Sequence, residues 1–297
     1  MVSVSAVVVT YNRLDLLKEC LAALLGQSYS LAHLIVIDNH SDAPTQTYLK
    51  QLGAKIDYVR LKENIGGAGG FYSGIKYFAE KTNDDFVWLM DDDTIPDKNA
   101  LNALVAAYKA KPATGFLASN PKWVDGTPAI MNVPVVAHPL WTSALNADSH
   151  LIEISRASFV SVMTSRAVVL KLGLPIRQFF IWGDDTEYTE RITQQYKAYL
   201  VPDSLVTHKM KLNRGVNILE DDSARAGRYF YAYRNRLYNS RRRSRKEVIH
   251  YYIQFTSTTL HLLFGHSKHR WHKLRVIFSG MLAGITFRPK IEFPNVK

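Results

Sequence analysis

The feature that most constrains the fold is a regular alternation, from Val2 to about Asp222, of short β-branched apolar runs with amphipathic segments. The apolar runs before Gly115 are VSAVVVT, HLIVIDN, IDYVRLKEN and DFVWLMDDD. Each is followed by a segment with helical periodicity: LDLLKECLAALLGQ, TQTYLKQLG, GFYSGIKYFAEKT and KNALNALVAAYKAK. Such a repeat predicts an α/β fold, in which helices flank a mostly parallel sheet. Between Gly115 and Ser155 the pattern loosens into mixed strands and loops.

The composition favours a cytoplasmic protein with a full core. Of the 297 residues, 47% are hydrophobic, and the single cysteine, Cys20, excludes an internal disulfide framework and a cysteine-based zinc cluster. The N-terminus, MVSVSAVVVTYNR, lacks the basic start and the cleavage site of a signal peptide. We therefore expect this segment to be the first strand of the fold.

The positive charge is concentrated at the C-terminal end. Residues 225–297 hold 16 Lys and Arg but only 2 Asp and Glu, whereas the preceding residues are slightly acidic. We expect two parts: an α/β domain over 1–224 and a basic helical extension over 225–297. One helical face of the extension carries Ile249, Tyr252, Ile253, Thr256, Leu260, Leu263 and Phe264. This pattern predicts helices that lie on an anionic membrane surface, because the apolar segments are too polar or too short to cross a bilayer.

A basic extension also suits nucleic acid, which is the binding-only alternative. The run RRRSRK with neighbouring tyrosines could contact phosphates and stack on bases. However, the aromatic residues recur in helical stripes with apolar ones, and an acidic domain would repel a polyanion. We therefore expect no nucleic acid partner.

Three consecutive acids follow the apolar run FVWLM, at the carboxyl end of a predicted strand. Ligands of an open parallel sheet bind at the carboxyl ends of its strands. Asp91 and Asp93 are two residues apart on an extended segment, so both can reach one Mg²⁺ or Mn²⁺ ion. Asp92 then points away, toward a sugar or ribose hydroxyl. The alternative is a helix cap with surplus surface acid, since Thr94 or Asp97 could cap the next helix.

Four glycines in ENIGGAGGF lie between a predicted strand and a predicted helix. The segment matches neither the dinucleotide-binding G-x-G-x-x-G pattern nor a P-loop. Glycines here would let backbone N–H groups approach a pyrophosphate at the helix N-terminus. A flexible connection is the alternative.

A second acidic group, Asp184, Asp185 and Glu187, follows the aromatic run FFIW. Inverting sugar transfer needs a carboxylate that accepts the proton of the acceptor hydroxyl, and Asp185 is the candidate base. Helix capping by Asp184 or Thr186 is the alternative. His208 follows a later strand near the same edge and is the candidate third metal ligand, with a purely structural role as the alternative.

In this order, the motifs VVVTYNR, VIDNHS, NIGGAGGF, WLMDDD, WGDDTEY and VTHK resemble the family 2 glycosyltransferases with the GT-A fold. NIGGAGGF, the triple Asp and the WGDDTEY block are most similar to bacterial galactofuranosyltransferases, and next to rhamnosyltransferases. The resemblance covers about the first 220 residues.

The resemblance also implies roles for individual residues. Those expected to hold uracil and ribose are Thr10, Asn12, Arg13 and Asp38. Those expected to flank the diphosphate and the donor sugar are Asn64, Gly66, Gly67, Gly69, Gly70 and Asp92. Those expected to bind the metal ion are Asp91, Asp93 and His208. Asp185 would be the base, and those expected to shape the acceptor site are Trp182, Asp184 and Glu187.

The implied activity is inverting, metal-dependent transfer of galactofuranose from UDP-galactofuranose to a lipid-linked glycan. It would serve bacterial cell-surface polysaccharide synthesis, such as that of O-antigen, at the inner face of the membrane. Transfer of rhamnose from dTDP-rhamnose is the nearest alternative. Nucleotidyl transfer is weaker, because TYNRLDLL after the first strand is not a Gly-rich basic loop. Tyr231, Arg234 and Asn235 either face the acceptor or pack.

Overall fold

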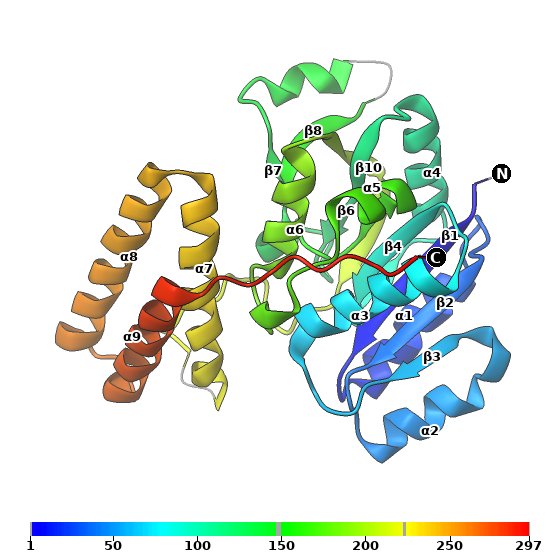
Figure 1. The fold of residues 1–297 in the computed structure, drawn as a ribbon. Coiled ribbons are helices and arrows are strands. Elements are labelled where there is room, and N and C mark those ends of the chain that lie inside the picture. The colour runs from blue at the N-terminus through cyan, green and yellow to red at the C-terminus, as the bar shows by residue number, and fades with distance from the viewer. Residues whose placement is uncertain (1, 147–149, 222–223, 297) are drawn as a thin grey trace.

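The computed structural model describes residues 2–146, 150–221 and 224–296. A central sheet with helices on both faces forms one end of the molecule, and three further helices form the other end (Figure 1). The sheet has the strand order β3-β2-β1-β4-β9-β6-β10-β8-β7, and β5 pairs with β10 beside this path.

The first half of the sheet is parallel. Its strands are β1 (Val4–Thr10), β2 (His33–Asp38), β3 (Asp57–Arg60) and β4 (Phe86–Asp91). β1 pairs with both β2 and β4, so the ends of these three strands meet at one edge. The β-branched run in β1 is entirely buried, as expected of a strand covered on both faces.

The second half of the sheet is mixed. Its strands are β5 (Thr94–Pro96), β6 (Thr114–Lys122), β7 (Val135–Val136), β8 (Ile152–Arg156), β9 (Val162–Ser165) and β10 (Lys197–His208). β9 runs antiparallel between β4 and β6, whereas β10 is parallel to β6. The region between Gly115 and Ser155, predicted as mixed strands and loops, contributes β6, β7 and β8 at this side of the sheet.

Two hydrophobic clusters separate the helices by face. The helices packed on one face are α1 (Leu14–Leu25), α2 (Ala43–Gln51) and α4 (Ala100–Ala110). Those on the other face are α3 (Gly66–Lys81), α5 (Arg166–Leu172) and α6 (Asp184–Thr193). Alternate residues of β1 supply the two clusters, with Ala6 and Val8 on one face and Val7 and Val9 on the other.

The C-terminal extension is helical, as predicted. Its helices are α7 (Tyr229–Arg243), α8 (Arg245–Phe264) and α9 (Arg270–Thr286), preceded by a short 3₁₀ turn over Ala224–Arg228. They share a core of their own that includes Leu237, Tyr251 and Ile277. After α9 the chain returns across the sheet domain (Figure 1), where the Tyr72 hydroxyl lies 2.6 Å from Glu292 Oε2. The last residues therefore pack on the first part of the chain.

The structure confirms an α/β fold with a helical C-terminal extension. It corrects the position of the glycine stretch, because Gly66, Gly67, Gly69 and Gly70 lie inside the first turns of α3. Further short 3₁₀ turns cover Gly53–Lys55, Ile130–Asn132, Trp141–Asn146 and Arg177–Phe179. Within the described residues, none of the helices has the length and apolarity needed to span a membrane.

Candidate active site

Two acids and a distant imidazole meet at the carboxyl edge of the sheet. One oxygen each of Asp91 and Asp93 and one ring nitrogen of His208 all lie within 4.8 Å of one another. Strand pairing explains this meeting, because β5 runs antiparallel to the end of β10 and places His208 opposite Thr94. Ligands of one octahedral Mg²⁺ lie at most about 4.2 Å apart. Small side-chain rotations would therefore let all three ligate one ion.

The carboxyl groups of Asp91, Asp92 and Asp93 have different pKa values. Burial and the neighbouring carboxylates raise the pKa of Asp91 well above its ordinary value, and burial raises that of Asp92 to about 6. Burial also acts to raise the pKa of Asp93, but His208 and Arg13 outweigh it and lower this pKa. His208 Nε2 lies 3.0 Å from Asp93 Oδ1. A divalent cation would relieve the repulsion that remains at Asp91.

Asn132 orients the imidazole and was missed by sequence reasoning. Its side-chain oxygen lies 2.9 Å from His208 Nδ1, and its amide donates to Ser158 Oγ at 2.9 Å. A proton held on Nδ1 by this contact would leave the Nε2 lone pair for a metal ion. Asn132 lies in a 3₁₀ turn of the loosely patterned region, where no motif marks it.

The residues expected to bind the nucleotide surround the end of β1. Thr10 Oγ1 donates to Asp92 Oδ2 at 2.7 Å, and the Arg13 guanidinium contacts both Asp92 and Asp93. The Asn12 side-chain oxygen accepts a hydrogen bond from the backbone of Asp42 at 2.7 Å. Asp92 is therefore directed toward β1, and Arg13 lies between it and Asp93.

Asp38 lies at the same edge but is fully buried. Its Oδ2 accepts hydrogen bonds from the Tyr58 hydroxyl at 2.8 Å and from Arg60 at 2.6 Å. Its Oδ1 accepts one from the Ser41 backbone at 2.7 Å. A nucleotide that bound Asp38 would have to share the carboxylate with these protein donors.

Three backbone N–H groups at the start of α3 donate to protein acceptors. The backbone N–H of Ile65 donates to Asn39 Oδ1, that of Gly66 to Asn64 Oδ1, and that of Ala68 to the Phe180 carbonyl. These donors are thus occupied by protein acceptors. A Cβ would meet neighbouring atoms at Gly66, Gly69 and Gly70 but nothing within 4 Å at Gly67. Gly67 is therefore the one of these four glycines that faces open space.

Two of these glycines are required by packing. Gly66 has φ +77, and a Cβ there would lie 2.0 Å from the Phe180 carbonyl oxygen. At Gly70 a Cβ would lie 2.3 Å from Val9 Cγ1, so the absence of a side chain lets α3 approach β1. Gly70 therefore serves helix-to-sheet packing.

The second acidic group begins α6, and its members lie in different environments. Asp185 borders a cavity of about 660 Å³ that Trp182 also lines. Asp184 is buried, and its charge contributes to the raised pKa of Asp91, so the two acidic groups are near each other. Burial raises the pKa of Asp185 and, with the charge of Asp185, raises the pKa of Asp184 to about 8.

The expected acceptor contact of Glu187 is not supported. This residue is 3% exposed, does not line the cavity, and its Oε2 pairs with Arg191 at 2.9 Å. Arg242 lies 3.5 Å from its other oxygen. Glu187 and Asp185 both lie in the first turn of α6, but residues two apart on a helix point in different directions. Glu187 therefore faces the interior.

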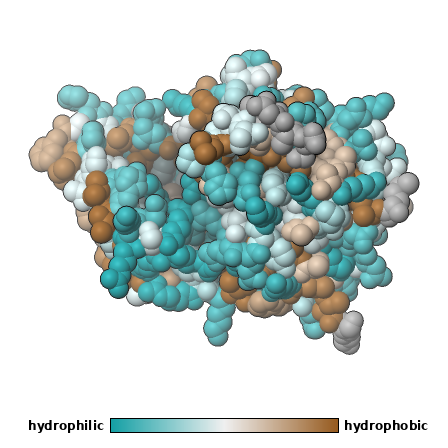
Figure 2. Space-filling model, turned by 90° about the horizontal axis from the view of Figure 1, so that it is seen from above, coloured by the Kyte–Doolittle hydropathy of each residue, from teal (hydrophilic) through white to brown (hydrophobic). Residues whose placement is uncertain are grey.

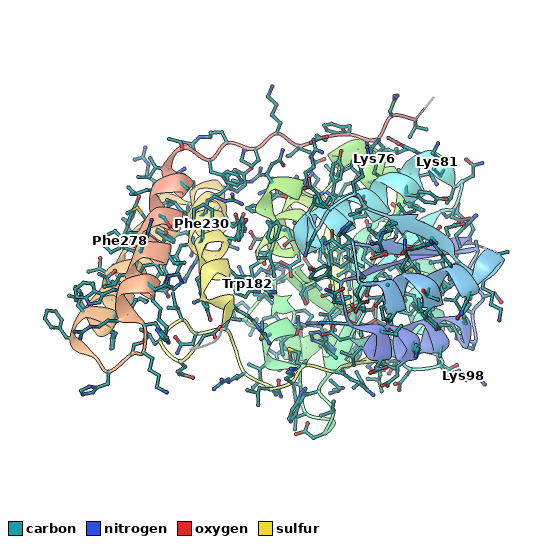
Figure 3. The ribbon with its side chains drawn as sticks, turned by 90° about the horizontal axis from the view of Figure 1, so that it is seen from below. Lys76, Lys81, Lys98, Trp182, Phe230 and Phe278 are labelled. Atoms are coloured by element: carbon teal, nitrogen blue, oxygen red, sulfur yellow. The ribbon has the colours of Figure 1, made fainter. Side chains whose placement is uncertain are left out.

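Helix α7 holds the loop that precedes α6. We name residues 178–183 the Trp182 loop, and Figure 3 shows Trp182 at the junction between the sheet domain and α7. The Asn235 amide donates to the carbonyls of residues 179, 181 and 182 at 2.9 to 3.0 Å. The Asn239 amide donates to the Gly183 carbonyl at 3.0 Å.

Tyr231, Arg234 and Asn235 of α7, whose role the sequence left open, pack against the Trp182 loop. The Tyr231 ring stacks on Phe180 with centroids 4.7 Å apart, and Arg234 bonds to loop carbonyls. Asn235 is buried. A polar residue at a buried position of an amphipathic helix is the signal that could have indicated such a contact.

Comparisons with known proteins agree with this geometry. A family model described as glycosyl transferase family 2 matches residues 5–170, more than half of the chain. The galactofuranosyltransferase GlfT1 of Mycolicibacterium smegmatis is 29% identical over 255 residues, which cover 79% of this chain and 82% of that protein. A poly-β-1,6-N-acetyl-D-glucosamine synthase of Staphylococcus aureus is 23% identical over 193 residues, which cover 64% of this chain and 44% of that protein.

Solved structures share the fold at lower identity. GalNAc-T7, crystallised with UDP, GalNAc and Mn²⁺, has a TM-score of 0.61 at 16% identity. The match covers 83% of this chain but only 51% of that one, so this chain spans about half of its length. Residues 1–349 of S. aureus TarS have a TM-score of 0.58 at 18% identity, over 96% of this chain and 81% of that one.

Proposed function

The chain belongs to glycosyl transferase family 2, and we propose that it transfers galactofuranose from UDP-galactofuranose to a lipid-linked glycan with inversion of the anomeric carbon. The family and the GT-A fold, both predicted from the order of the motifs, are confirmed by the family model and the fold similarity. The choice of donor is supported by similarity to two proteins named galactofuranosyltransferase, from Mycolicibacterium smegmatis and Mycobacterium tuberculosis.

The observation that carries the proposal is the meeting of Asp91, Asp93 and His208 at the strand edge, with Asp185 at a nearby cavity. Carboxylate and imidazole ligands suit Mn²⁺ well, and Mg²⁺ is the alternative. When bound, the ion would offset the negative charge that builds on the departing diphosphate. Thr10, Arg13 and Asp92 would contact the nucleotide part of the donor.

Asp185 supplies the base in this proposal. Its carboxylate takes the proton from the acceptor hydroxyl as that oxygen bonds to the anomeric carbon. The bond from that carbon to the donor diphosphate breaks in the same step, and UDP leaves with the electron pair. Because burial raises the pKa of Asp185, its carboxylate is a stronger base than an exposed aspartate.

Donor consumption tests the proposal. Pure protein is incubated with Mn²⁺ and a panel of UDP- and dTDP-sugars, and the remaining donor is measured by chromatography. We expect consumption of UDP-galactofuranose, and a fall of about a hundredfold to ten-thousandfold in Asp91→Ala and Asp185→Asn. Asp203→Asn is the matched control, because Asp203 is exposed on β10. If only dTDP-rhamnose were consumed, the donor would be dTDP-rhamnose and not UDP-galactofuranose. Full activity of both variants would refute the roles assigned to Asp91 and Asp185.

The surface of the C-terminal helices supports a membrane-bound acceptor. Apolar side chains on α8 remain exposed: Ile249 at 60%, Ile253 at 61%, Leu260 at 48% and Phe264 at 82%. Figure 2 shows hydrophobic side chains at the left end of the molecule, where α8 lies. The surrounding extension carries the excess of Lys and Arg. We propose that these helices lie on the inner face of the cell membrane, with apolar side chains toward the lipid and cations toward phosphates.

Vesicle sedimentation tests this surface. We expect the double variant Ile253→Glu with Phe264→Glu to lose most of its sedimentation with phosphatidylglycerol vesicles, because two exposed apolar side chains that would enter the lipid become charged. Leu25→Glu is the control, since Leu25 is 51% exposed on α1. Unchanged sedimentation of the double variant would refute the proposal. RNA binding as strong as vesicle binding would instead favour a nucleic acid partner.

A further inference from the structure

One surface segment of the sheet domain contains no charged residue. We name residues 126–141 the uncharged loop; it includes the 3₁₀ turn Ile130–Asn132 and β7, the strand at the end of the sheet. No Asp, Glu, Lys or Arg occurs between Gly126 and Asn146, although 21% of the chain is charged. Depletion of charge is typical of surfaces that become covered by an apolar partner.

Apolar side chains of the uncharged loop are exposed. Ile130 is 60% exposed, Val133 52% and Leu140 78%. Met131, Val135 and Trp141 are exposed as well. Single exposed apolar residues are ordinary on a protein surface, but a group of them without an intervening charge indicates an interaction site.

Hydrogen bonds hold the uncharged loop against the sheet domain. The Asn132 side chain contacts His208 and Ser158, each at 2.9 Å. The backbone N–H of Ile130 donates to Asn213 Oδ1 at 2.9 Å. The polar side chain of this turn is thus directed inward, whereas its apolar neighbours remain in contact with solvent.

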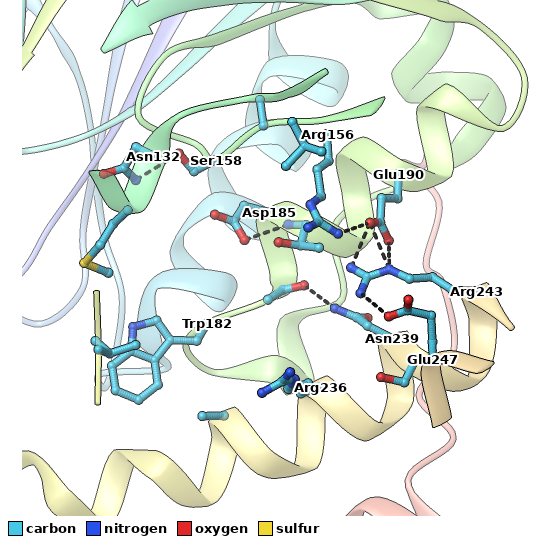
Figure 4. A pocket seen from close by; sticks show the side chains of 18 of the residues that line it. Asn132, Arg156, Ser158, Trp182, Asp185, Glu190, Arg236, Asn239, Arg243 and Glu247 are labelled. Atoms are coloured by element: carbon cyan, nitrogen blue, oxygen red, sulfur yellow. Dashed lines mark hydrogen bonds and ion pairs between the residues drawn. The ribbon is translucent and has the colours of Figure 1, made fainter. Parts of the chain in front are cut away.

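The uncharged loop borders the cavity of about 660 Å³ at which the candidate base lies. Met131, Val133 and Val135 line this cavity together with Asp185. Figure 4 shows Asn132 of the loop and Glu247 of α8 on opposite sides of it. Two segments with exposed apolar side chains, the uncharged loop and α8, therefore border the same cavity.

A lipid bilayer fits these observations better than a second copy of the chain. A second copy on the loop would restrict access to the cavity that the loop lines. β7 consists of Val135 and Val136 only and follows Pro134, so it offers little edge for strand pairing. A bilayer can contact the loop and α8 together, while the cations of the C-terminal extension attract lipid phosphates. Trp141 suits the depth of the head groups, because its ring is apolar and its N–H is polar.

We propose that the uncharged loop inserts into the surface of the lipid bilayer, so that the cavity at Asp185 opens toward the membrane. The apolar side chains of the loop enter the outer hydrocarbon, and α8 contacts the bilayer on the other side of the cavity. The lipid part of the acceptor then remains in the hydrocarbon during transfer. Because the membrane position of the acceptor belongs to the proposed function, this inference rests on that function.

A fluorescent label tests the insertion without requiring turnover. Cys20 is fully buried, so the dye NBD attached to Leu140→Cys reports on the loop alone. The vesicles contain equal parts of phosphatidylcholine and phosphatidylglycerol. We expect NBD emission to rise when the full chain binds vesicles, and spin-labelled lipid to quench it, because lipid replaces water around the dye.

Leu25→Cys is the matched control for the label. Leu25 is exposed at the end of α1, which returns the chain from the carboxyl end of β1 to the opposite edge of the sheet. The emission of NBD at this position should not change on vesicle binding.

Charge in the loop provides a second test. Ile130→Glu with Leu140→Glu should weaken vesicle binding about tenfold or more, because burial of even one such side chain is worth about tenfold. Leu25→Glu should bind vesicles as the wild type does. Circular dichroism checks that the variants fold.

Three results would overturn the inference. The label at residue 140 could keep its emission in water on vesicle-bound protein, or the double variant could bind vesicles as the wild type does. The third result is emission that rises with protein concentration in the absence of vesicles, together with a dimer in light scattering, which would assign the loop to a second copy.

Consumption of UDP-sugars, measured without vesicles, separates this failure from failure of the proposed function. Donor consumption without a lipid signal from the loop would reject the insertion and leave the transferase activity standing. A lipid signal without consumption of any donor would support the insertion and reject the proposed function.

Discussion

Asn235→Ala should impair turnover far more than donor binding, because Asn235 holds the Trp182 loop from α7. The side chain is 1% exposed, and its amide nitrogen lies 2.9 Å, 3.0 Å and 2.9 Å from the carbonyl oxygens of Phe179, Ile181 and Trp182. An amide group has two hydrogens, so these contacts amount to about two hydrogen bonds. Alanine removes both donors.

The loss of stability follows from the unpaired carbonyls. Each buried polar group left without a partner costs about 1 to 3 kcal/mol. Phe180 and Trp182 have φ values of 65 and 63, in a region that costs non-glycine residues about 1 kcal/mol or more each. Relaxation of this strain returns part of the loss, so we expect the free energy of unfolding to fall by about 2 to 3 kcal/mol.

The effect on catalysis follows from geometry. The Trp182 loop leads directly into the first turn of α6, where Asp185 lies. Misplacement of a reacting group by 1 Å can cost about a hundredfold in rate. We expect kcat to fall by about this factor. The KM for the donor should not change, since the residues proposed to bind the nucleotide lie at the ends of β1 and β4 and not in the Trp182 loop.

Guanidinium chloride unfolding and steady-state kinetics measure the two effects. Asn102→Ala, at an exposed position of α4, is the matched control and should change neither. Asn235→Asp should be worse than Asn235→Ala, because a carboxylate would face three carbonyl oxygens without a donor. A variant that lost stability but kept kcat within threefold would show that α7 does not position the base.

Three further perturbations test other parts of the site. Asn132→Ala should weaken Mn²⁺ binding about 10- to 100-fold in calorimetry, because the partner that orients His208 is lost; unchanged affinity would contradict that contact. Gly66→Ala should lower the melting temperature, since its Cβ would lie 2.0 Å from the Phe180 carbonyl oxygen; a melting temperature equal to the wild type would be the contrary result. The pKa of Asp184, about 8, lies above its ordinary value of 3.8, so the folded state favours the protonated form and stability should fall as pH rises between these values. Denaturant unfolding of Asp184→Asn at pH 5 and pH 8 should show a smaller difference in the free energy of unfolding than the wild type shows. An equal difference would refute this prediction.

The parallel sheet was predictable because its signal is local. In a β-branched run such as that of β1, and in the amphipathic segment after it, the spacing of the apolar residues indicates the secondary structure. This spacing does not depend on residues far away in the chain. Asp91 and Asp93 were placed together by the same logic, since residues two apart on a strand share a side. The sequence order of the motifs sufficed for the family.

The local sequence gave no sign of features that depend on a contact between distant elements. Three backbone N–H groups at the start of α3, those of Ile65, Gly66 and Ala68, donate to protein acceptors on other segments or next to the helix. Glu187 was grouped with Asp185 by proximity along the chain, yet the rotation of α6 turns it toward Arg191. Neither partner can be identified from the local sequence.

The sequence by itself determined the α/β class, the family and the acids that end β4 and begin α6, because these follow from periodicity and adjacency. Only the tertiary structure decided that His208 reaches Asp93 across 115 residues, which depends on the register between β5 and β10. It also decided that Asn132 orients this imidazole and that α7 encloses the base. Such contacts depend on how separate elements pack, and packing joins residues whose separation along the chain carries no periodic signal.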